Sequence, residues 1–380
     1  MMKMMMNLKV DPSRTALVVL SGLLIFLSFP EYGSGIFAWA ALIPLFFALQ
    51  GVLPREGFKI GFLAGFTAHV GILYWIAYVV VQHGYLPFYV GIAAMLLLSA
   101  YLSLYTAFFA FAIVFLRGKG IPLFLSAPSV WTLLDFARSH LLTGFPWEHL
   151  AHSQYLYGKV IQVGDITGTY GITFAIVLIN VVLYDLFSRE SRRSHLIAES
   201  VAACFVIAVI ITYGHVRSET IGELLEKNRS LEVTLVQGNI DQNLKWNSRY
   251  QLQTIAIYRS LSLQSALSPG GLIVWPETAV PLYFQQPSMM QAAVVDIAAN
   301  SRSALLFGSP SYEGEVKNIS YMNSAFLLGP DGTVSGRYDK VHLVPYGEYV
   351  PLTGFSPSST SSWLGSAISS RAGLLSPHHR

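Results

Sequence analysis

The stretch from Thr15 to Phe115 constrains this chain most, because it carries almost no charge. A stretch this long and this apolar requires lipid as its solvent. Over all 380 residues the hydrophobic share is 53% and the charged share is 12%, about half the usual charged share of a soluble domain. This composition excludes a disordered protein and a coiled coil, and it argues against an ordinary cytosolic enzyme. The four charged residues of the stretch are Glu31, Arg55, Glu56 and Lys59.

Seven apolar runs before residue 218 are candidates for membrane spans, since a span needs roughly 20 apolar residues. The first run resembles the core of a signal peptide, but no small-residue cleavage site follows it. We therefore predict a multi-pass α-helical membrane bundle of about seven spans over residues 1–217. The runs are Thr15–Pro30, Gly35–Val52, Ile60–Val81, Leu86–Leu116, Ile121–Leu142, Ile161–Phe187 and Leu196–Tyr213.

The basic residues predict the orientation of this bundle. With seven spans, ten Lys and Arg residues fall on the side of the N-terminus and three on the other side, up to residue 217. Because basic loops stay in the cytoplasm, we expect a cytoplasmic N-terminus and a soluble domain outside the cytoplasm, which in a Gram-negative cell is the periplasm. The net charge of +3 is too small to suggest a nucleic-acid partner. The three residues on the far side are Arg138, Lys159 and Arg217.

The segment Gly144–Gln154, between the fifth and sixth runs, is too polar to be a plain membrane anchor. Ionisable groups at membrane depth are costly and usually face an interior or a wet cavity. One interpretation is a lipid-headgroup site at the outer leaflet. The other is an interfacial loop whose Trp147 and Tyr155 belong to an aromatic belt. The sequence favours neither interpretation over the other.

From about Ser218 the pattern changes to that of a soluble domain, in which predicted strands alternate with predicted helices. Period-two alternation indicates a strand at Ser230–Gln237, and amphipathic spacing indicates a helix at Trp246–Leu267. This alternation predicts an α/β layered domain over residues 218–352. Further expected elements are strands at Gly271–Pro276 and Ala304–Gly308, a helix at Met289–Ala299, and a hairpin turn at Gly329–Gly332.

Glu277 directly follows the short apolar strand Gly271–Pro276. Flanked by Trp275 and Pro276, its carboxylate would be partly desolvated and suited to act as a general base. The alternative is a carboxylate that caps the N-terminus of the next helical element. For a single glutamate without further evidence, this capping role is the more common one.

The segment Arg337–Pro351 contains two further candidate site residues. Lys340 follows a hairpin strand and could place its ammonium against a developing oxyanion. Glu348 could orient Lys340 or assist a proton transfer. The alternatives are an ordinary surface lysine and a solvated loop charge.

Four segments together resemble the bacterial apolipoprotein N-acyltransferases, over roughly residues 10–351. That family joins a multi-span membrane bundle to a periplasmic domain of the nitrilase (carbon–nitrogen hydrolase) superfamily. The resemblance therefore implies a nitrilase-like αββα sandwich for the soluble domain. Its strongest part is a lysine followed by Leu-Val-Pro, an aromatic residue, Gly-Glu, an aromatic residue and Val-Pro. The segments are Gly144–Gln154, Val236–Trp246, Val274–Thr278 and Tyr338–Pro351.

In that family a Glu, a Lys and a Cys catalyse a ping-pong acyl transfer. The resemblance implies that a cysteine thiolate takes an acyl chain from a phospholipid as a thioester. The amine of a diacylglyceryl-cysteine lipoprotein then accepts it, without a cofactor or a metal. By resemblance, Glu277 is the general base, Lys340 stabilises the tetrahedral intermediate and Glu348 supports them. The residues expected to contact substrates are Trp246, Tyr346 and Trp147.

The chain departs from the family at the nucleophile, which should follow Lys340 by tens of residues. Its only cysteine, Cys204, precedes Glu277 and lies in the seventh apolar run, where an apolar helix makes a thiol inert. Residues 353–380 are rich in serine and are expected to be disordered. We therefore expect a reading frame truncated or shifted near residues 352–356, and an incomplete nitrilase-like domain. The alternative function is a catalytically inactive membrane protein that binds phospholipid or lipoprotein.

Overall fold

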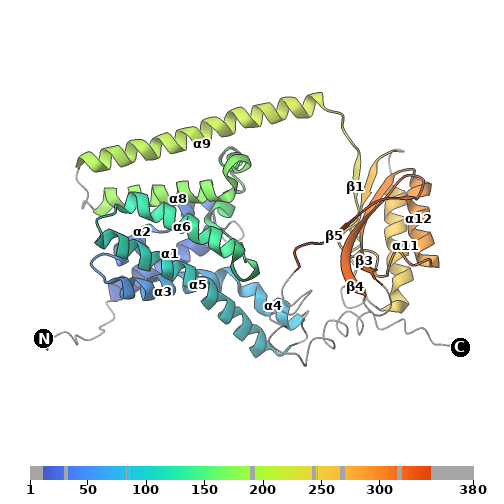
Figure 1. Ribbon diagram of the computed structural model, residues 1–380, viewed down its shortest axis with the longest axis horizontal. Coiled ribbons are helices and arrows are strands. Elements are labelled where there is room, and N and C mark those ends of the chain that lie inside the picture. Colours follow the sequence, from blue (N-terminus) through green and yellow to red (C-terminus); the bar gives the residue numbers. More distant parts are fainter. Residues whose placement is uncertain are drawn as a thin grey trace. The chain divides into compact units, whose positions relative to one another are not determined.

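The computed structural model describes residues 12–343, apart from residues 30–32, 83, 85, 189–192, 242–244, 246, 266–269 and 315–318. The chain folds into two compact units, Met1–Lys227 and Asn228–Arg380 (Figure 1). The sequence predicts this boundary after residue 217. The structure places it after Lys227, because the last helix of the first unit continues to that residue.

Every regular element described in the first unit is a helix, and each of the seven predicted apolar runs contains at least one. The described residues of this unit form α-helices and 3₁₀ helices and no strand. They are α1 (Pro12–Leu27), η1 (Gly35–Trp39), α2 (Ile43–Ala48), α3 (Pro54–Ile72), α4 (Tyr74–Gln82), α5 (Phe88–Gly118), α6 (Leu123–His140), η2 (Leu141–Thr143), η3 (Leu150–Gln154), α7 (Gly158–Ile161), α8 (Gly164–Ser188) and α9 (Arg193–Lys227).

Three described helices are long and apolar enough to cross a membrane, namely α5, α8 and α9 from Ser194 onward. A fourth span results if α3 and α4, which are bent by 48° at their junction, are counted together. Helix α1 and the stretch Gly35–Ala48 are apolar but shorter. These helices indicate a membrane protein. The number of seven spans stays a prediction.

Helices α3 and α5 pack closely because glycines line the face of α3 that meets α5. Gly57, Gly61 and Gly65 recur every four residues and so lie on one face of the helix. A Cβ atom on Gly61 would overlap the carbonyl oxygen of Thr106, and one on Gly65 would lie 2.9 Å from the side chain of Thr106. Small residues at this spacing let the backbones approach, which stabilises helix pairs in lipid.

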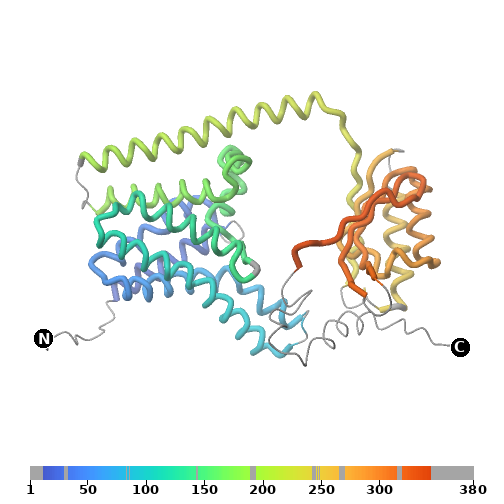
Figure 2. Tube along the Cα trace, viewed as in Figure 1, coloured from blue at the N-terminus to red at the C-terminus, as the bar shows by residue number. Residues whose placement is uncertain are grey.

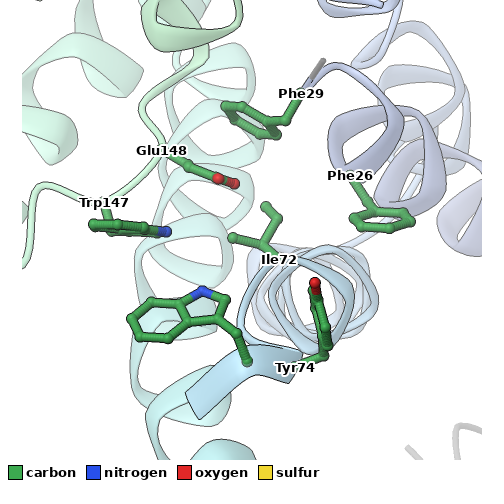
Figure 3. Close-up of a pocket in the computed structure, with 7 residues that line it drawn as sticks. Phe26, Phe29, Ile72, Tyr74, Trp147 and Glu148 are labelled. Carbon is green, nitrogen blue, oxygen red and sulfur yellow. The ribbon is translucent and has the colours of Figure 1, made fainter. Parts of the chain in front are cut away.

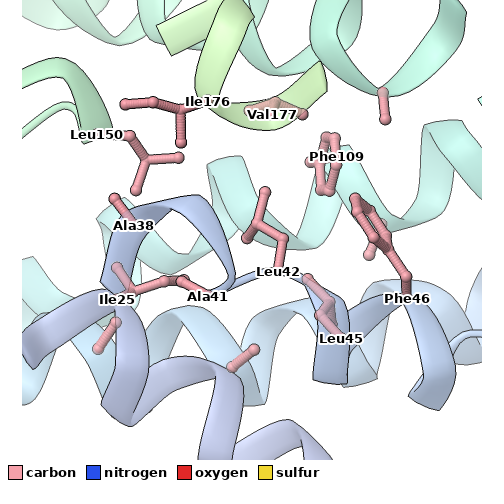
Figure 4. Packing of buried hydrophobic residues seen from close by; sticks show 14 of the residues in the cluster. Ile25, Ala38, Ala41, Leu42, Leu45, Phe46, Phe109, Leu150, Ile176 and Val177 are labelled. Atoms are coloured by element: carbon pink, nitrogen blue, oxygen red, sulfur yellow. The ribbon is translucent and has the colours of Figure 1, made fainter. Parts of the chain in front are cut away.

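The second apolar run is broken into η1 and α2, and a polar side chain from α8 bonds the backbone at the break. Asn180 donates from Nδ2 to the carbonyl of Ala38 and accepts at Oδ1 from the amide of Leu42, both over 2.8 Å. Because unpaired backbone groups are costly in an apolar core, Asn180 makes this break tolerable. Figure 4 shows Leu42 and Phe46 packed with Phe109 of α5 in the core of this unit.

The second unit contains a five-stranded mixed sheet in the order β1-β2-β3-β4-β5. Strands β1, β2 and β3 are parallel, whereas β3, β4 and β5 run antiparallel to one another in turn. Two helices, α11 and α12, cover one face of the sheet (Figure 2). The elements are β1 (Val233–Leu235), α11 (Ser248–Ser265), β2 (Leu272–Val274), α12 (Met289–Ser301), β3 (Ala304–Glu313), β4 (Ser320–Leu328) and β5 (Val334–Asp339).

The core of this unit lies between the sheet and these two helices. Tyr258 of α11 stacks on Trp275, which follows β2, with ring centroids 4.7 Å apart. Ile297 of α12 and Leu305 of β3 are fully buried in the same cluster. Each predicted strand and helix is present, and β3 is longer than predicted because its second half pairs with β4.

The mixed sheet confirms the α/β class that the sequence predicts for the soluble part. An αββα sandwich has two sheets between two helical layers. The described residues of this unit form one sheet with helices on one face, so the complete sandwich stays a prediction. The Ser-rich segment at residues 353–380 lies outside the described residues.

Candidate functional site

Glu277 lies in the loop that follows β2, and the backbone of Gly308 in β3 bonds this loop on both sides of Glu277. The carbonyl of Gly308 accepts from the amide of Val280 over 3.0 Å, and its amide donates to the carbonyl of Pro276 over 3.4 Å. A Cβ atom at position 308 would lie 2.8 Å from the Cα atom of Glu277, closer than Cβ atoms come in real proteins. The bare backbone of Gly308 therefore lets the Glu277 loop close onto β3.

Lys340 and Asn323 meet the carboxylate of Glu277 from the neighbouring hairpin. The amide of Lys340 donates to the carbonyl of Asn323 over 2.8 Å, which extends the pairing of β4 and β5 by one step. Both side chains then reach the same atom. Lys340 Nζ lies 3.2 Å from Glu277 Oε1, and Asn323 Nδ2 donates to that oxygen. The structure thus brings Glu277 and Lys340 together, while their catalytic roles stay a prediction.

The Glu277 side chain is 62% exposed and that of Lys340 is 30% exposed. The expected partial desolvation of Glu277 is therefore wrong for the described part of the chain. The reason is that Trp275 turns into the core, where its indole nitrogen donates to Ser262 Oγ over 2.9 Å, and does not cover the carboxylate. Ion pairs this exposed contribute about 0.2–1 kcal/mol, so stability alone does not account for the arrangement.

Asp339, the residue before Lys340, anchors the end of β5. Its carboxylate accepts from Nε and Nη2 of Arg337, over 2.9 Å and 3.1 Å, and from the hydroxyl of Ser324. Burial alone would raise the pKa of Asp339, but the hydrogen bonds from Ser324 and Arg337 outweigh it and lower the pKa below its usual 3.8. These bonds fix the strand end from which Lys340 extends.

A pocket of about 610 Å³ lies beside the Glu277 loop. Lys245 lines this pocket and donates from Nζ to the backbone carbonyl of Glu277 over 3.3 Å. Burial lowers the pKa of Lys245 from its usual 10.5, and the nearby charge of Glu277 opposes that shift. The pocket therefore holds a carboxylate and an amine in one wall. Its other polar and aromatic lining residues include Gln237, Asn239, Thr254, Tyr258 and Trp275.

Neither Asn323 nor Lys245 stands out in the sequence as a site residue. Lys245 belongs to the segment Val236–Trp246, which carries part of the family resemblance, so a signal for it exists. Asn323 lies within β4, where an amide is ordinarily a surface residue. It reaches Glu277 only through the register of β4 with β3 and β5, which no local pattern reveals.

Trp147 lies in the first unit, where it lines a pocket of about 290 Å³ (Figure 3). Its ring is 5.2 Å from that of Trp75, and the residue is 45% exposed. The end of the segment Gly144–Gln154 is anchored in the bundle, because Gln154 accepts from Trp39 Nε1 over 3.0 Å and donates to the carbonyl of Gly35 over 2.7 Å. This segment therefore contributes both to the core of the unit and to an accessible pocket.

Three predicted site residues, Trp246, Tyr346 and Glu348, lie outside the described residues, so their roles stay predictions. Cys204 lies on α9 in the first unit, and its side chain is exposed. Within the described ranges, no three His, Cys, Asp or Glu side chains gather closely enough to hold a metal ion.

Two family models match the chain. The model of the apolipoprotein N-acyltransferase N-terminal domain matches residues 21–182. The model of carbon-nitrogen hydrolase matches residues 232–373. The first match falls within the helical unit, and the second contains Glu277 and Lys340.

Curated relatives named apolipoprotein N-acyltransferase match most of the chain. The relative from Geobacter metallireducens is 41% identical over 345 residues, which cover 90% of this chain and 66% of the relative. Those from Pasteurella multocida and Neisseria meningitidis serogroup B are 28% and 32% identical, over 88% and 82% of this chain and 64% and 61% of their own lengths. The chain thus spans just under two thirds of the length of these relatives.

Proposed function

Because this chain belongs to the apolipoprotein N-acyltransferase family, we propose that it transfers an acyl chain from a phospholipid to the N-terminal amine of a diacylglyceryl-cysteine lipoprotein. The observation that carries this proposal is the 3.2 Å contact between Lys340 Nζ and Glu277 Oε1. A base and a cation are the two groups that acyl transfer requires besides a nucleophile. The apolar helices of the same chain suit substrates that both carry acyl chains.

In the proposed reaction Glu277 is the general base and Lys340 stabilises negative charge. Glu277 accepts the proton of a thiol, whose sulfur attacks the ester carbonyl of the phospholipid and forms a C–S bond. The Lys340 ammonium balances the charge on the carbonyl oxygen. The C–O bond then breaks, and the lysophospholipid leaves with the proton. In the second half, the lipoprotein amine attacks the thioester and gives up a proton to Glu277 as the C–N bond forms. The C–S bond then breaks, and Glu277 passes this proton to the sulfur.

This reaction needs a thiol, and the one cysteine among residues 1–380 is Cys204. Cys204 belongs to the first unit, whereas Glu277 and Lys340 belong to the second. A second candidate function for the chain is a membrane protein that binds phospholipid or diacylated lipoprotein without turnover.

We further propose a bacterial inner-membrane location with a cytoplasmic N-terminus and a periplasmic second unit. The excess of basic residues on the N-terminal side, ten against three, supports this orientation. In this proposal the membrane bundle is followed by a nitrilase-like domain up to residue 352 and a Ser-rich tail. Glu348 supports the catalytic pair, and Trp246, Tyr346 and Trp147 contact the two lipid substrates.

One assay separates acyl transfer from binding alone. The full chain, purified in detergent, is incubated with a fluorescent phospholipid and a diacylated lipopeptide, and products are identified by mass spectrometry. N-acylated lipopeptide that is lost in Glu277→Gln and kept in Glu313→Gln supports acyl transfer. Glu313 is a matched control, because it is 64% exposed and pairs with Arg337 over 3.3 Å.

Two other results of this assay are informative. Saturable binding of both lipids without product supports the binding function and contradicts acyl transfer by this chain. Product from a Cys204→Ala variant would show that a nucleophile other than Cys204 is used.

A further inference from the structure

The pocket of about 290 Å³ in the first unit has a lining that the proposed acyl transfer does not explain. Its volume is at the small end of the range for ligand pockets, about 300–1,000 Å³, so it has room for one small group and not for an acyl chain. Five of its seven lining residues are aromatic. The lining residues are Phe26, Phe29, Ile72, Tyr74, Trp75, Trp147 and Glu148.

The aromatic rings come from three separate parts of the chain and converge on this space (Figure 3). Trp75 of α4 and Trp147 of the Gly144–Gln154 segment lie with ring centroids 5.2 Å apart and ring planes tilted by 48°. Trp147 and Tyr74 are 45% and 48% exposed, so the pocket can be reached from outside the unit. Aromatic rings attract cations, because the ring face carries partial negative charge.

Glu148 adds a carboxyl group to this aromatic pocket. Its carboxylate points into the space between Phe29 and Ile72 (Figure 3), and its Oε2 atom is buried. The backbone of Glu148 has a φ of 51°, in the left-handed region that costs energy for a residue with a side chain. Strain of this kind persists only where the surroundings impose it, and it is concentrated at binding sites.

We propose that this pocket binds an ammonium group, with Trp75, Trp147 and Tyr74 as an aromatic cage and Glu148 as the counter-ion. A phosphate or a carboxylate ligand is disfavoured, because Glu148 would repel it and the lining contains no Lys or Arg. An uncharged apolar group would surround the carboxylate with further apolar surface, which is costly for a charged group. An ammonium suits both the rings and the carboxylate.

The choice of ligands rests on the proposed function, which offers two sources of an ammonium. One is the headgroup of an aminophospholipid, and the other is the α-amine of the diacylated lipoprotein. The shared chemistry is a primary ammonium next to an apolar anchor.

Binding to the full chain in detergent tests this proposal. The probes are dihexanoyl-phosphatidylethanolamine and a diacylated lipopeptide, each compared with its N-acetylated form, which has lost the charge. We expect wild type to bind at least one free amine about tenfold more tightly than its acetylated form. We expect Glu148→Gln and Trp147→Leu to remove this preference, and Trp147→Phe to retain most of it.

Phe108→Leu on α5 is the matched control, because Phe108 is 52% exposed and does not line the pocket. Preference for the free phospholipid amine identifies a headgroup site, and preference for the free lipopeptide amine identifies an acceptor site. Equal affinity of wild type for the free and acetylated forms of both probes would overturn the proposal without any variant. A preference that survives both Glu148→Gln and Trp147→Leu would overturn it as well.

This experiment measures binding and not turnover, so its outcome is independent of whether the chain transfers acyl groups. An inactive chain that still prefers the free amine keeps the ammonium site and loses only the proposed reaction. An active chain without that preference keeps the reaction and loses the site.

Discussion

The ammonium of Lys245 donates to the backbone carbonyl of Glu277 over 3.3 Å, while the Glu277 carboxylate accepts from Lys340 and Asn323. Lys245 therefore holds the loop, and the other two residues hold the side chain. This division makes Lys245 a positioning residue whose effect passes through the backbone of Glu277.

We predict that Lys245→Met loosens the Glu277 loop. Amide exchange in residues 276–280 should become about tenfold faster, because a bond from a charged donor to the backbone is lost. Hydrogen–deuterium exchange with mass spectrometry measures this directly. Lys227→Met is the control, since Lys227 is 73% exposed and pairs only with Glu223 on its own helix among the contacts described. Unchanged exchange in Lys245→Met would remove Lys245 from this role.

A pH dependence is expected from Asp339. Its hydrogen bonds lower its pKa below 3.8 in the folded chain, so the unfolded chain takes up the proton first as the pH falls. The stabilisation is fully present above the unfolded pKa and is lost as the pH falls through the folded value. The thermal unfolding temperature of the second unit should therefore fall more steeply below about pH 4 in wild type than in Asp339→Asn. Parallel curves would contradict the assignment.

The close approach of α3 and α5 predicts that Gly61 tolerates no side chain. In Gly61→Ala the new methyl group would overlap the carbonyl of Thr106, and overpacking of this kind costs about 1–3 kcal/mol. Gly118→Ala on α5 is the control, because a Cβ atom added there would meet nothing within 4 Å, and alanine should be neutral or stabilising. Thermal unfolding of both variants in detergent checks this. Equal unfolding temperatures of Gly61→Ala and Gly118→Ala would contradict a tight contact between α3 and α5 at Gly61.

The break between η1 and α2 depends on Asn180. Asn180→Leu keeps a similar volume but leaves the carbonyl of Ala38 and the amide of Leu42 without this partner. Each buried group left unsatisfied costs about 1–3 kcal/mol, so the variant should yield little folded protein. Gln162→Leu is the control, since that amide bonds only within its own turn in the described contacts, to the carbonyl of Gly158. Monodisperse elution on size exclusion distinguishes the two.

The elements of the second unit are predictable from local pattern, because strand alternation and turn residues are written in short segments. The strand before Glu277 and the hairpin before Lys340 lie where the sequence predicts them. The meeting of Glu277 with Asn323 is not predictable in this way. It depends on strand register between residues that are 46 positions apart and on the close approach at Gly308.

The helical unit shows where hydropathy stops being informative. An apolar run predicts a helix, but it does not reveal that Asn180 permits a break at Ala38, or that α3 and α4 bend by 48°. Hydropathy also predicts the end of α9 too early, because the residues after Tyr213 are polar. Pairs four residues apart, such as Glu223 with Lys227 at 3.2 Å, support the helix there without any apolar face.

Gly308 has no side chain, and yet a genetic screen should score it together with Glu277, whose loop lies against it. Any substitution there would push the Glu277 loop away from β3, because even a methyl group would collide with the backbone at Glu277 and Thr278. A mutational map of this protein would then show that a glycine on a buried strand tolerates substitution as poorly as Glu277 does. Sites that chemistry requires and sites that merely leave space for chemistry are indistinguishable by phenotype, and only the geometry separates them.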